Sequence, residues 1–357
     1  MIASLGGGGA ERQLSEMANF WAVQGWKVIL ATWSGNEVAD FYRLDKRVER
    51  VYLTDGSTAR VSASRIIANL SRVMLLRRLL KSSKADAVLS FMTESNLLTI
   101  IAASRLRLQV VVSERVQPAM HSAFPWVWRA LRRILYARAD TVVAQTKDAA
   151  QWIVRYCRAR VTVIPNALRP LPEPQLGKRP EIVAVGRLTH QKGFDLLLEA
   201  YARILPSFPE WTLAIIGEGE ERDNLTRLCT RLGLDEHARF VGQTADILPW
   251  MERAALVVQP SRFEGFPNVL LEGMGLGAAV ISSDCPSGPS DLIEEGVNGR
   301  LVPVDDVSTL AKVMADLMRN GDERDRLGRA ALKVRERYRQ DEIMRRWEAS
   351  LFPQGVS

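Results

Sequence analysis

Short apolar runs rich in β-branched residues alternate with helical patterns along most of this 357-residue chain. The runs have the length of buried strands, and the segments between them carry apolar residues at helical spacing. This alternation predicts an α/β fold with doubly wound parallel sheets. The runs of the first half are Lys27–Trp33, Arg50–Leu53, Asp86–Phe91, Gln109–Ser113, Thr141–Ala144 and Val161–Ile164.

The length of the chain predicts two domains, since one ordinary core would be too small for it. Residues 169–180 contain four prolines and show no periodicity, which is typical of a linker. We therefore expect an N-terminal Rossmann-like domain over residues 1–168, the linker over 169–180, and a C-terminal domain over 181–338. Residues 339–357 carry a last helical pattern.

The composition is that of an ordinary globular protein, with 47% hydrophobic and 25% charged residues. No apolar run reaches the roughly 18 residues that a membrane span needs, and no signal-peptide pattern opens the chain. Three scattered cysteines predict reduced thiols in the cytoplasm. The three histidines are too few for a histidine-rich metal site.

The net charge of +7 is unevenly distributed. Residues 1–168 hold 24 Lys and Arg against 12 Asp and Glu, a net charge of +12, whereas the remainder holds 24 against 29, or −5. The basic half therefore favours an anionic partner, which could be a phosphate-bearing acceptor, a membrane surface or nucleic acid. No nucleic-acid-binding signature accompanies it, and we prefer the membrane surface.

Residues 124–138 combine arginines with interfacial tryptophans. Helical spacing places Arg129, Arg132, Arg133 and Tyr136 on one face, an apolar row on another, and Trp126 and Trp128 at the start. This pattern predicts a helix that lies on an anionic leaflet. The alternative is a surface helix whose apolar face belongs to the core.

The segment from Ser261 to Glu272 follows a strand-like run, Ala254–Val258. Glu264 is expected in the loop at the carboxyl end of the strand, and Glu272 about two turns into the next helix. The amides at the helix start, those of Gly265, Phe266 and Asn268, are predicted to be free to bind ligand oxygens. Two acids and free amides suit a nucleotide-sugar, so the domain over 181–338 is expected to be the nucleotide-sugar-binding domain. Alternatively, Glu264 caps the helix and Glu272 is solvated.

Three further segments carry candidate phosphate ligands. The glycines Gly7, Gly8 and Gly9 precede a helix expected over residues 10–24, whose N-terminus suits a diphosphate; the alternative is a flexible turn. Arg187 and Lys192 bracket a strand-to-helix loop and suit a diphosphate, or are simply exposed cations. Glu114 and Arg115 end a strand, and Arg115 either contacts an acceptor phosphate or pairs with Glu114.

The E-x7-E spacing in F-E-G-F-P-N-V-L-L-E-G-M resembles the signature of the family-4 retaining glycosyltransferases, which have the GT-B fold. Other features similar to this family occur in order and cover nearly the whole chain. They are Gly6–Gly9, Ser113-Glu114, I-P-N at 164–166, G-R-L-x-x-x-K-G at 186–193 and G-E-G-E at 217–220.

The resemblance implies a retaining sugar transfer that needs no metal or other cofactor, and no D-x-D occurs at a strand end. Arg187 and Lys192 would stabilise the leaving diphosphate. Glu264 would bind sugar hydroxyls, and Glu272 the ribose hydroxyls. Gly217 and Glu218 would lie near the nucleotide base. The last helix would cross back onto the N-terminal domain, with Trp347 and Leu351 packed there.

The expected donor is a UDP-linked hexose or N-acetylhexosamine, with GDP-mannose as the next choice. The expected acceptor is a polyprenyl-diphosphate-linked sugar in surface-polysaccharide assembly, which would place the protein at the inner, cytoplasmic face of the bacterial plasma membrane. Members of the family begin with a longer first strand, so this chain is expected to be truncated or its start codon placed late. A sugar-nucleotide epimerase and a catalytically silent nucleotide-sugar-binding protein are the alternatives, and the scarcity of histidine counts against the epimerase.

Overall fold

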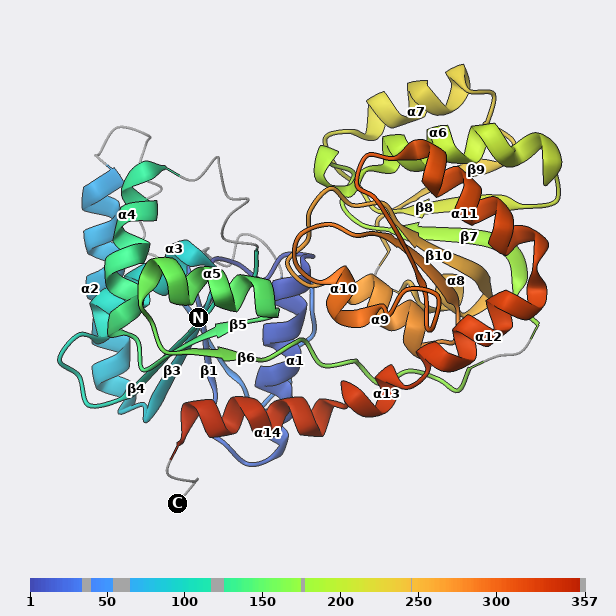
Figure 1. Cartoon of the computed structure of the whole chain (residues 1–357). Coiled ribbons are helices and arrows are strands. Elements are labelled where there is room, and N and C mark those ends of the chain that lie inside the picture. The colour runs from blue at the N-terminus through green and yellow to red at the C-terminus, as the bar shows by residue number, and fades with distance from the viewer. Residues whose placement is uncertain (34–39, 54–64, 117–124, 175–176, 245, 354–357) are drawn as a thin grey trace. The chain divides into compact units, whose positions relative to one another are not determined.

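Figure 1 shows the computed structural model of the chain, which describes residues 1–33, 40–53, 65–116, 125–174, 177–244 and 246–353. Two residues of the expected linker, 175 and 176, lie outside this part. The chain forms two compact units: unit 1 is Met1–Asn166 with Asp341–Ser357, and unit 2 is Ala167–Gln340. Each unit contains a parallel sheet with helices, which confirms the predicted α/β class.

The main sheet of unit 1 is parallel and has the order β3-β4-β5-β6. Its strands are β3 (Ala87–Phe91), β4 (Gln109–Ser113), β5 (Thr141–Ala144) and β6 (Val161–Val163). A separate parallel pair is formed by β1 (Ile29–Thr32) and β2 (Glu49–Tyr52). Val110 of β4 pairs with Val88, and Val112 pairs with Val142. Such β-branched neighbours fit strands that are buried on both faces.

The first three residues of the chain lie between β1 and β3. The N–H of Ile2 donates to the carbonyl of Ala31 at 3.3 Å, and the N–H of Phe91 donates to the carbonyl of Met1 at 3.0 Å. The amino group of Met1 donates to the carbonyl of Leu89 at 2.8 Å. This segment is therefore bonded to a strand edge on both sides, in the central position of a doubly wound sheet.

The helices of unit 1 cover this layer of strands. They are α1 (Gly9–Val23), α2 (Arg65–Ser83), α3 (Thr93–Ala103), α4 (Trp126–Leu135), α5 (Lys147–Cys157) and α14 (Gln340–Leu351), with a short η1 (Tyr136–Arg138) after α4. Trp347 on α14 is 1% exposed and its ring centroid lies 5.9 Å from that of Phe91. The indole Nε1 of Trp21 donates to Glu348 Oε1 at 3.1 Å. The last helix is thus built into the core of unit 1 beside α1 (Figure 1).

The sheet of unit 2 is parallel, with the order β12-β11-β10-β7-β8-β9. Its strands are β7 (Arg179–Val185), β8 (Thr212–Ile216), β9 (Ala238–Gly242), β10 (Ala254–Gln259), β11 (Ala279–Ser283) and β12 (Arg300–Val302). Every residue of β10 is buried. A run of this kind is typical of a central strand with helices on both faces.

The helices of unit 2 flank this sheet (Figure 1). They are α6 (Phe194–Ile204), α7 (Arg222–Arg231), α8 (Leu248–Arg253), α9 (Asn268–Gly275), α10 (Pro289–Leu292), α11 (Val307–Arg319), α12 (Gly321–Ala331) and α13 (Val334–Arg337), with short turns η2 (His190–Lys192) and η3 (Leu205–Ser207). Asp306 caps α11 by accepting a hydrogen bond from the N–H of Thr309 at 2.9 Å. Among the described residues, no helix has the length and apolar content that a membrane span requires.

Candidate active site

Three loops leave one edge of the unit 2 sheet side by side. The strands β10, β7 and β8 are neighbours and run parallel, so their carboxyl ends lie at the same edge. In open α/β sheets this edge is where ligands bind. Arg187 and Lys192 follow β7, Gly217 and Glu218 follow β8, and Glu264 follows β10.

Glu264 is buried in the loop after β10, with 5% of its surface exposed. Its Oε1 accepts hydrogen bonds from Lys192 Nζ, Gln259 Nε2 and Ser261 Oγ, each at 2.6 Å. Pairing and hydrogen bonding of this kind are what a buried carboxylate requires. The alternative in which Glu264 caps the next helix is wrong, because α9 starts without a side-chain cap.

The loops after β7 and β10 pack backbone against backbone. Gln191 Nε2 donates to the carbonyl of Phe263 at 2.9 Å. Gly193 has φ +65°, and a Cβ atom at this position would lie 2.1 Å from the carbonyl oxygen of Pro260. Only glycine allows both the backbone conformation and the close approach. This packing brings Lys192 against the carboxylate of Glu264.

The two predicted cations of the loop after β7 have different surroundings. The side chain of Lys192 is 18% exposed and forms an ion pair of 2.6 Å with Glu264. Its stem passes over Gly186, where a Cβ atom would lie 3.2 Å from Lys192 Cδ. Arg187 is exposed. The alternative of two exposed cations is therefore wrong for Lys192.

Glu272 lies on α9 and is 2% exposed. Its Oε2 is 3.2 Å from Arg169 Nη2, in an ion pair whose arginine comes from the proline-rich segment before β7. The alternative in which Glu272 is a solvated helical position is therefore wrong. Arg169 was not predicted as a site residue, because its segment shows only the features of a linker.

The turn after β8 depends on Gly217, which has φ +146°. A Cβ atom here would lie 1.9 Å from the carbonyl oxygen of Gly186, so the turns after β7 and β8 touch through their backbones. The N–H of Leu188 also donates to the carbonyl of Glu218 at 3.0 Å. The carboxylate of Glu218 is exposed and accepts from Arg222 Nη1 at 2.9 Å.

The predicted row of free amides at the start of α9 is shorter than expected. The N–H of Asn268 donates to the carbonyl of Phe266 at 3.0 Å, so this amide is not free. The tight turn around Pro267 brings these two groups together. The ring of Phe266 is buried, with its centroid 6.2 Å from that of Tyr338. The amides of Gly265 and Phe266 stay as candidate donors to a ligand.

Cys285 is buried near the Lys192–Glu264 pair. Burial, followed by the charge of the Glu264 carboxylate, raises the pKa of its thiol to about 12. The thiol is therefore protonated at neutral pH and is not activated as a nucleophile.

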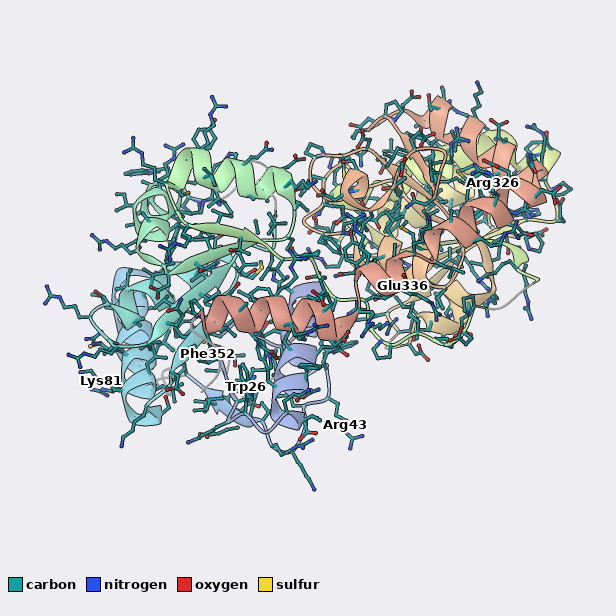
Figure 2. All side chains as sticks on the ribbon, turned by 60° about the horizontal axis from the view of Figure 1, so that its bottom comes forward. Trp26, Arg43, Lys81, Arg326, Glu336 and Phe352 are labelled. Atoms are coloured by element: carbon teal, nitrogen blue, oxygen red, sulfur yellow. The ribbon has the colours of Figure 1, made fainter. Side chains whose placement is uncertain are left out.

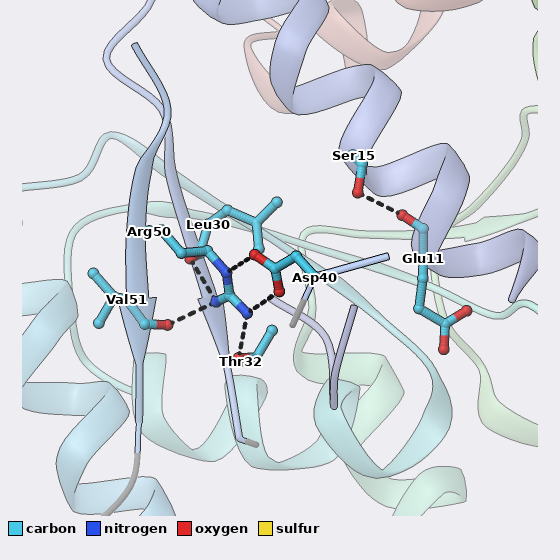
Figure 3. Close-up of polar contacts among 7 residues, drawn as sticks. All are labelled: Glu11, Ser15, Leu30, Thr32, Asp40, Arg50 and Val51. Atoms are coloured by element: carbon cyan, nitrogen blue, oxygen red, sulfur yellow. Dashed lines mark hydrogen bonds and ion pairs between the residues drawn. The ribbon is translucent and has the colours of Figure 1, made fainter. Parts of the chain in front are cut away.

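In unit 1 the glycine segment precedes α1, which begins at Gly9 with an extended Gly8 at its N-cap. A Cβ atom at Gly8 would lie 2.3 Å from Glu11 Oε2, so the carboxylate of Glu11 lies over the helix start. Ser15 Oγ donates to the carbonyl of Glu11 at 2.9 Å on the same helix (Figure 3). A phosphate bound beside Gly7 and Gly9 would therefore meet an acidic side chain that the sequence pattern did not suggest.

Glu114 follows β4 and is 3% exposed. Its carboxylate accepts hydrogen bonds from Thr93 Oγ1 at 2.9 Å and from the hydroxyl of Tyr136, and lies 3.8 Å from Arg132 Nη1. Burial, together with the Glu114 carboxylate, raises the pKa of the Tyr136 hydroxyl well above its ordinary value. Through its contacts with Thr93 and Arg132, the buried Glu114 carboxylate links α3 and α4 to the end of β4.

Arg115 is 7% exposed, and its Nη1 donates to Asn166 Oδ1 at 2.6 Å. The guanidinium carbon lies 3.5 Å from the centroid of the Phe91 ring and 5.6 Å from that of Trp347. Burial lowers the pKa of the guanidinium. Among the described residues, no ion pair joins Arg115 to Glu114, which lies near Arg132 instead. Within the described residues, Nε and Nη2 of Arg115 have no hydrogen-bond partner.

Helix α4 differs from the predicted arrangement of its faces. Arg132 is 1% exposed and Tyr136 is fully buried, because both contact the buried Glu114. They therefore cannot share a solvent-facing surface with Arg129 and Arg133, which are exposed. Trp128 is partly buried and packs against the core of unit 1. The outward surface consists of Trp126, Val127, Ala130 and Ile134 with the two exposed arginines.

Comparisons with known protein families cover nearly the whole chain. The family described as "Glycosyl transferases group 1" matches residues 172–334, and the "Glycosyl transferase 4-like domain" matches residues 8–167. The chain is a glycosyltransferase built from these two domains. The resemblance predicted from the sequence motifs is thus confirmed, and the protein is an enzyme that transfers sugars.

Relatives of this glycosyltransferase include bacterial enzymes of similar length. An uncharacterized glycosyltransferase of Haemophilus influenzae is 26% identical over 96% of both chains. The Campylobacter jejuni enzyme named "GalNAc-alpha-(1->4)-GalNAc-alpha-(1->3)-diNAcBac-PP-undecaprenol alpha-1,4-N-acetyl-D-galactosaminyltransferase" is 29% identical. That match covers 87% of this chain and 86% of the relative.

Among solved structures, HepE from Anabaena in complex with UDP and glucose has a TM-score of 0.83 to this glycosyltransferase. The match has 21% sequence identity and covers 98% of each chain. This similarity, with the two parallel-sheet units, supports the predicted GT-B fold.

Sequence reasoning missed three residues that hold the two acids of this glycosyltransferase. Gln259 and Ser261 bind Glu264, and Arg169 binds Glu272. The first two could have been found, because they are polar residues next to Glu264 at the end of a buried strand. Nothing in the sequence marks Arg169, whose contact joins positions 103 residues apart.

Proposed function

We propose that this glycosyltransferase moves a hexose or N-acetylhexosamine from a UDP-sugar to a lipid-linked saccharide, with retention of the anomeric configuration and without a metal. The observation that carries the proposal is the Lys192–Glu264 pair at the carboxyl edge of the unit 2 sheet. Lys192 and the exposed Arg187 offer positive charge for the diphosphate, and the buried Glu264 offers a hydrogen-bond acceptor for the sugar.

The donor assignment rests on these groups. An ammonium has three N–H donors, so Lys192 can contact a phosphate oxygen while it stays bonded to Glu264. Arg187 adds a planar fork that suits a second phosphate. The other oxygen of Glu264 can accept from a sugar hydroxyl, and Glu272 from the ribose. The UDP bound to HepE agrees with a uridine nucleotide.

The proposed reaction takes place on one face of the sugar. The bond between the anomeric carbon and the leaving phosphate oxygen breaks, while the acceptor hydroxyl oxygen bonds to the same carbon from the same side. The leaving phosphate oxygen takes the proton of that hydroxyl. Lys192 and Arg187 stabilise the negative charge that develops on the diphosphate.

The acceptor assignment draws on relatives. The Campylobacter jejuni enzyme is named for a saccharide linked to undecaprenol through diphosphate. A Salmonella typhimurium relative is named a lipopolysaccharide 1,6-galactosyltransferase and is 36% identical over 140 residues, which are 37% of each chain. The first name supports a lipid-linked acceptor for this glycosyltransferase, and the second supports a role in building a surface polysaccharide.

A donor panel tests the proposal. UDP-linked hexoses, UDP-linked N-acetylhexosamines and GDP-mannose are each incubated with lipid-linked saccharides extracted from bacterial membranes, and the released nucleotide is measured. We expect release with a UDP-sugar and an α-linked product from an α-linked donor, assigned by NMR. Donor binding without release would support the silent binding protein instead, and an inverted product would refute retention.

Variants connect the activity to the site. Lys192→Met removes the charge under the diphosphate and is expected to lower kcat by about 100-fold. Glu272→Gln is expected to raise the donor KM. Glu236→Gln, at an exposed position after α7, is the matched control and should keep full activity. Equal activity of all three variants in folded form would refute the assignment.

We also propose that α4 rests on an anionic membrane surface at the cytoplasmic face. Trp126 is 77% exposed and Ile134 is 59% exposed, and the exposed Arg129 and Arg133 lie on the same helix. Large apolar side chains with arginines beside them suit the interface of a leaflet with acidic lipids. Each arginine near such a surface contributes about 1 kcal/mol.

Liposome flotation tests this contact. Vesicles with anionic lipid should carry the protein to the top of the gradient, and neutral vesicles should carry less. Ser in place of both Trp126 and Ile134 should abolish flotation. Val297→Ser, an exposed apolar position of unit 2 at 43%, is the control and should float normally. Flotation that is unaffected by the α4 changes would refute the assignment.

A further inference from the structure

Arg169 lies in the proline-rich segment before β7, outside both of the residue ranges that match the glycosyltransferase families. Its Nη2 is 3.2 Å from Oε2 of Glu272, and the side chain of Arg169 is mostly buried. Within the part of the chain that the structure describes, the buried Nε of Arg169 has no hydrogen-bond partner. The guanidinium is therefore directed into unit 2 and toward this acid.

The segment that carries the arginine is packed against α9, the helix of the acid. The N–H of Leu168 donates to the carbonyl of Tyr338 at 2.8 Å, which holds the segment inside unit 2. A Cβ atom at Gly275 on α9 would lie 2.6 Å from Leu171 Cδ1 and 3.0 Å from Leu168 Cδ2. Both leucine side chains therefore lie directly against the helix.

Arg335 connects the same segment to α9 through hydrogen bonds. It comes from α13, the short helix on which Glu336 is labelled in Figure 2. Its Nε donates to the carbonyl of Gly275 at 2.7 Å, and its Nη2 donates to the carbonyl of Pro172. One planar guanidinium thus bridges the last residue of α9 and the proline-rich segment. The distance between the partners of the buried ion pair is therefore set by the backbone.

A buried carboxylate needs a partner of this kind. Glu272 is 2% exposed, and an ionised acid at this depth is costly unless a cation compensates it. Without the cation, such an acid turns toward water or takes up a proton, and it then offers a weaker acceptor to a hydroxyl. We propose that Arg169 is a positioning residue of the donor site, which holds Glu272 as an anion where the ribose hydroxyls bind. This inference rests on the proposed function, which supplies the ribose contact.

The ion pair leaves Glu272 able to bind the ribose. The two oxygens of a carboxylate accept about four hydrogen bonds, and the bond from Arg169 uses one of these positions. The proposed function assigns the charge of the leaving diphosphate to Lys192 and Arg187 and not to Arg169. Arg169 should therefore control how tightly the nucleotide binds, and in particular the preference for a ribose with its hydroxyls. The rate of the chemical step should not depend on it.

Binding of UDP and of 2′,3′-dideoxy-UDP tests the proposal, because the second compound lacks both ribose hydroxyls. By isothermal titration calorimetry, the original chain should bind UDP about 100-fold more tightly than the dideoxy compound. Arg169→Met should reduce this ratio of dissociation constants to below about 10. It should also raise the donor KM by about 10-fold and leave kcat within about 2-fold. If GDP-mannose is the donor, GDP and its dideoxy analogue take the place of the uridine pair.

A matched control breaks a similar ion pair at the opposite edge of the same sheet. Glu181, near the start of β7, is 4% exposed and accepts from Arg253 Nε at 2.6 Å. Arg253→Met should destabilise unit 2 and leave the ratio of the two dissociation constants unchanged. Arg169→Lys keeps the positive charge and should give a ratio between those of the original chain and Arg169→Met. If Arg169→Met does not fold, Arg169→Gln, which also lacks the charge, should show the same low ratio.

The outcomes separate this inference from the proposed function. If Arg169 were purely structural, Arg169→Met would weaken both nucleotides by the same factor, and this unchanged ratio would overturn the inference. In a chain that already carries Glu272→Gln, Arg169→Met should not lower the ratio further. A further decrease would mean that the arginine acts without the acid, which would also overturn it. Equal affinities of the original chain for both nucleotides would instead remove the ribose contact from the proposed function, and the inference with it.

Discussion

The amino group of Met1 predicts a specific dependence of stability on pH. Its pKa is lowered from 8.0 to about 5, first by burial and then by the nearby charge of Arg50. Asp40 holds that guanidinium in place with two bonds of 2.8 and 2.9 Å, and Thr32 Oγ1 accepts a third at 2.9 Å (Figure 3). The folded chain therefore keeps an uncharged amine at neutral pH, whereas the unfolded chain is largely protonated.

The sign and size follow from this difference. Between pH 5 and 8 the unfolded chain binds more protons, so the free energy of unfolding of unit 1 rises with pH. This contribution to the free energy of unfolding is complete above about pH 8. It decreases as the pH falls from 8 and is lost once the pH has fallen through 5. A shift from 8.0 to about 5 corresponds to about 4 kcal/mol.

Urea unfolding of the free and the Nα-acetylated chain measures this effect. The acetylated amide still donates to Leu89 and cannot take up a proton in this range. Tryptophan fluorescence is a suitable signal, because most of the nine tryptophans lie in unit 1. When the pH is lowered from 9 to 5, the free energy of unfolding of the acetylated chain should rise by about 4 kcal/mol relative to that of the free chain. Parallel pH profiles of the two chains would refute the assignment.

Two other predictions concern buried contacts. Arg132→Met should lower the free energy of unfolding by about 3–5 kcal/mol, because Glu114 stays buried without its ion pair; urea unfolding measures this, and a loss below 1 kcal/mol would contradict it. Gly217→Ala should lower it by about 3 kcal/mol, because φ is +146° and the new Cβ would meet the carbonyl of Gly186. Gly25→Ala, with φ +90° and open space, is the control and should lose less; equal losses would refute the steric argument.

The positions of the acids relative to their strands could be predicted from sequence. A buried β-branched run followed by Gly265 and Pro267 marks the end of β10, and this placed Glu264 at the ligand edge of the sheet. Its contact with Lys192 could not be predicted in the same way. That contact depends on β10 lying beside β7, and these strands are neighbours in space but not in sequence.

The faces of α4 show a second limit of sequence patterns. Helical spacing groups residues by direction, and it grouped Arg132 with the exposed Arg129 and Arg133. Which direction is buried depends on partners from other elements. Here Glu114 at the end of β4 attracts Arg132 inward, and the apolar Trp126 and Ile134 stay outside. A pattern within one helix contains no information about that acid.

The final helix gives this protein an order of assembly during synthesis. Trp347 on α14 packs against Phe91, so the core of unit 1 needs residues from both ends of the chain. All of unit 2 is translated between them, and at about 5–20 residues per second this takes roughly 10–35 s. During that interval the chain is still attached to the ribosome, and Phe91 lacks its packing partner Trp347. Chaperones can bind the ring of Phe91 during this time. A chain that ended between residues 340 and 347 would carry a complete second unit attached to an incomplete first one.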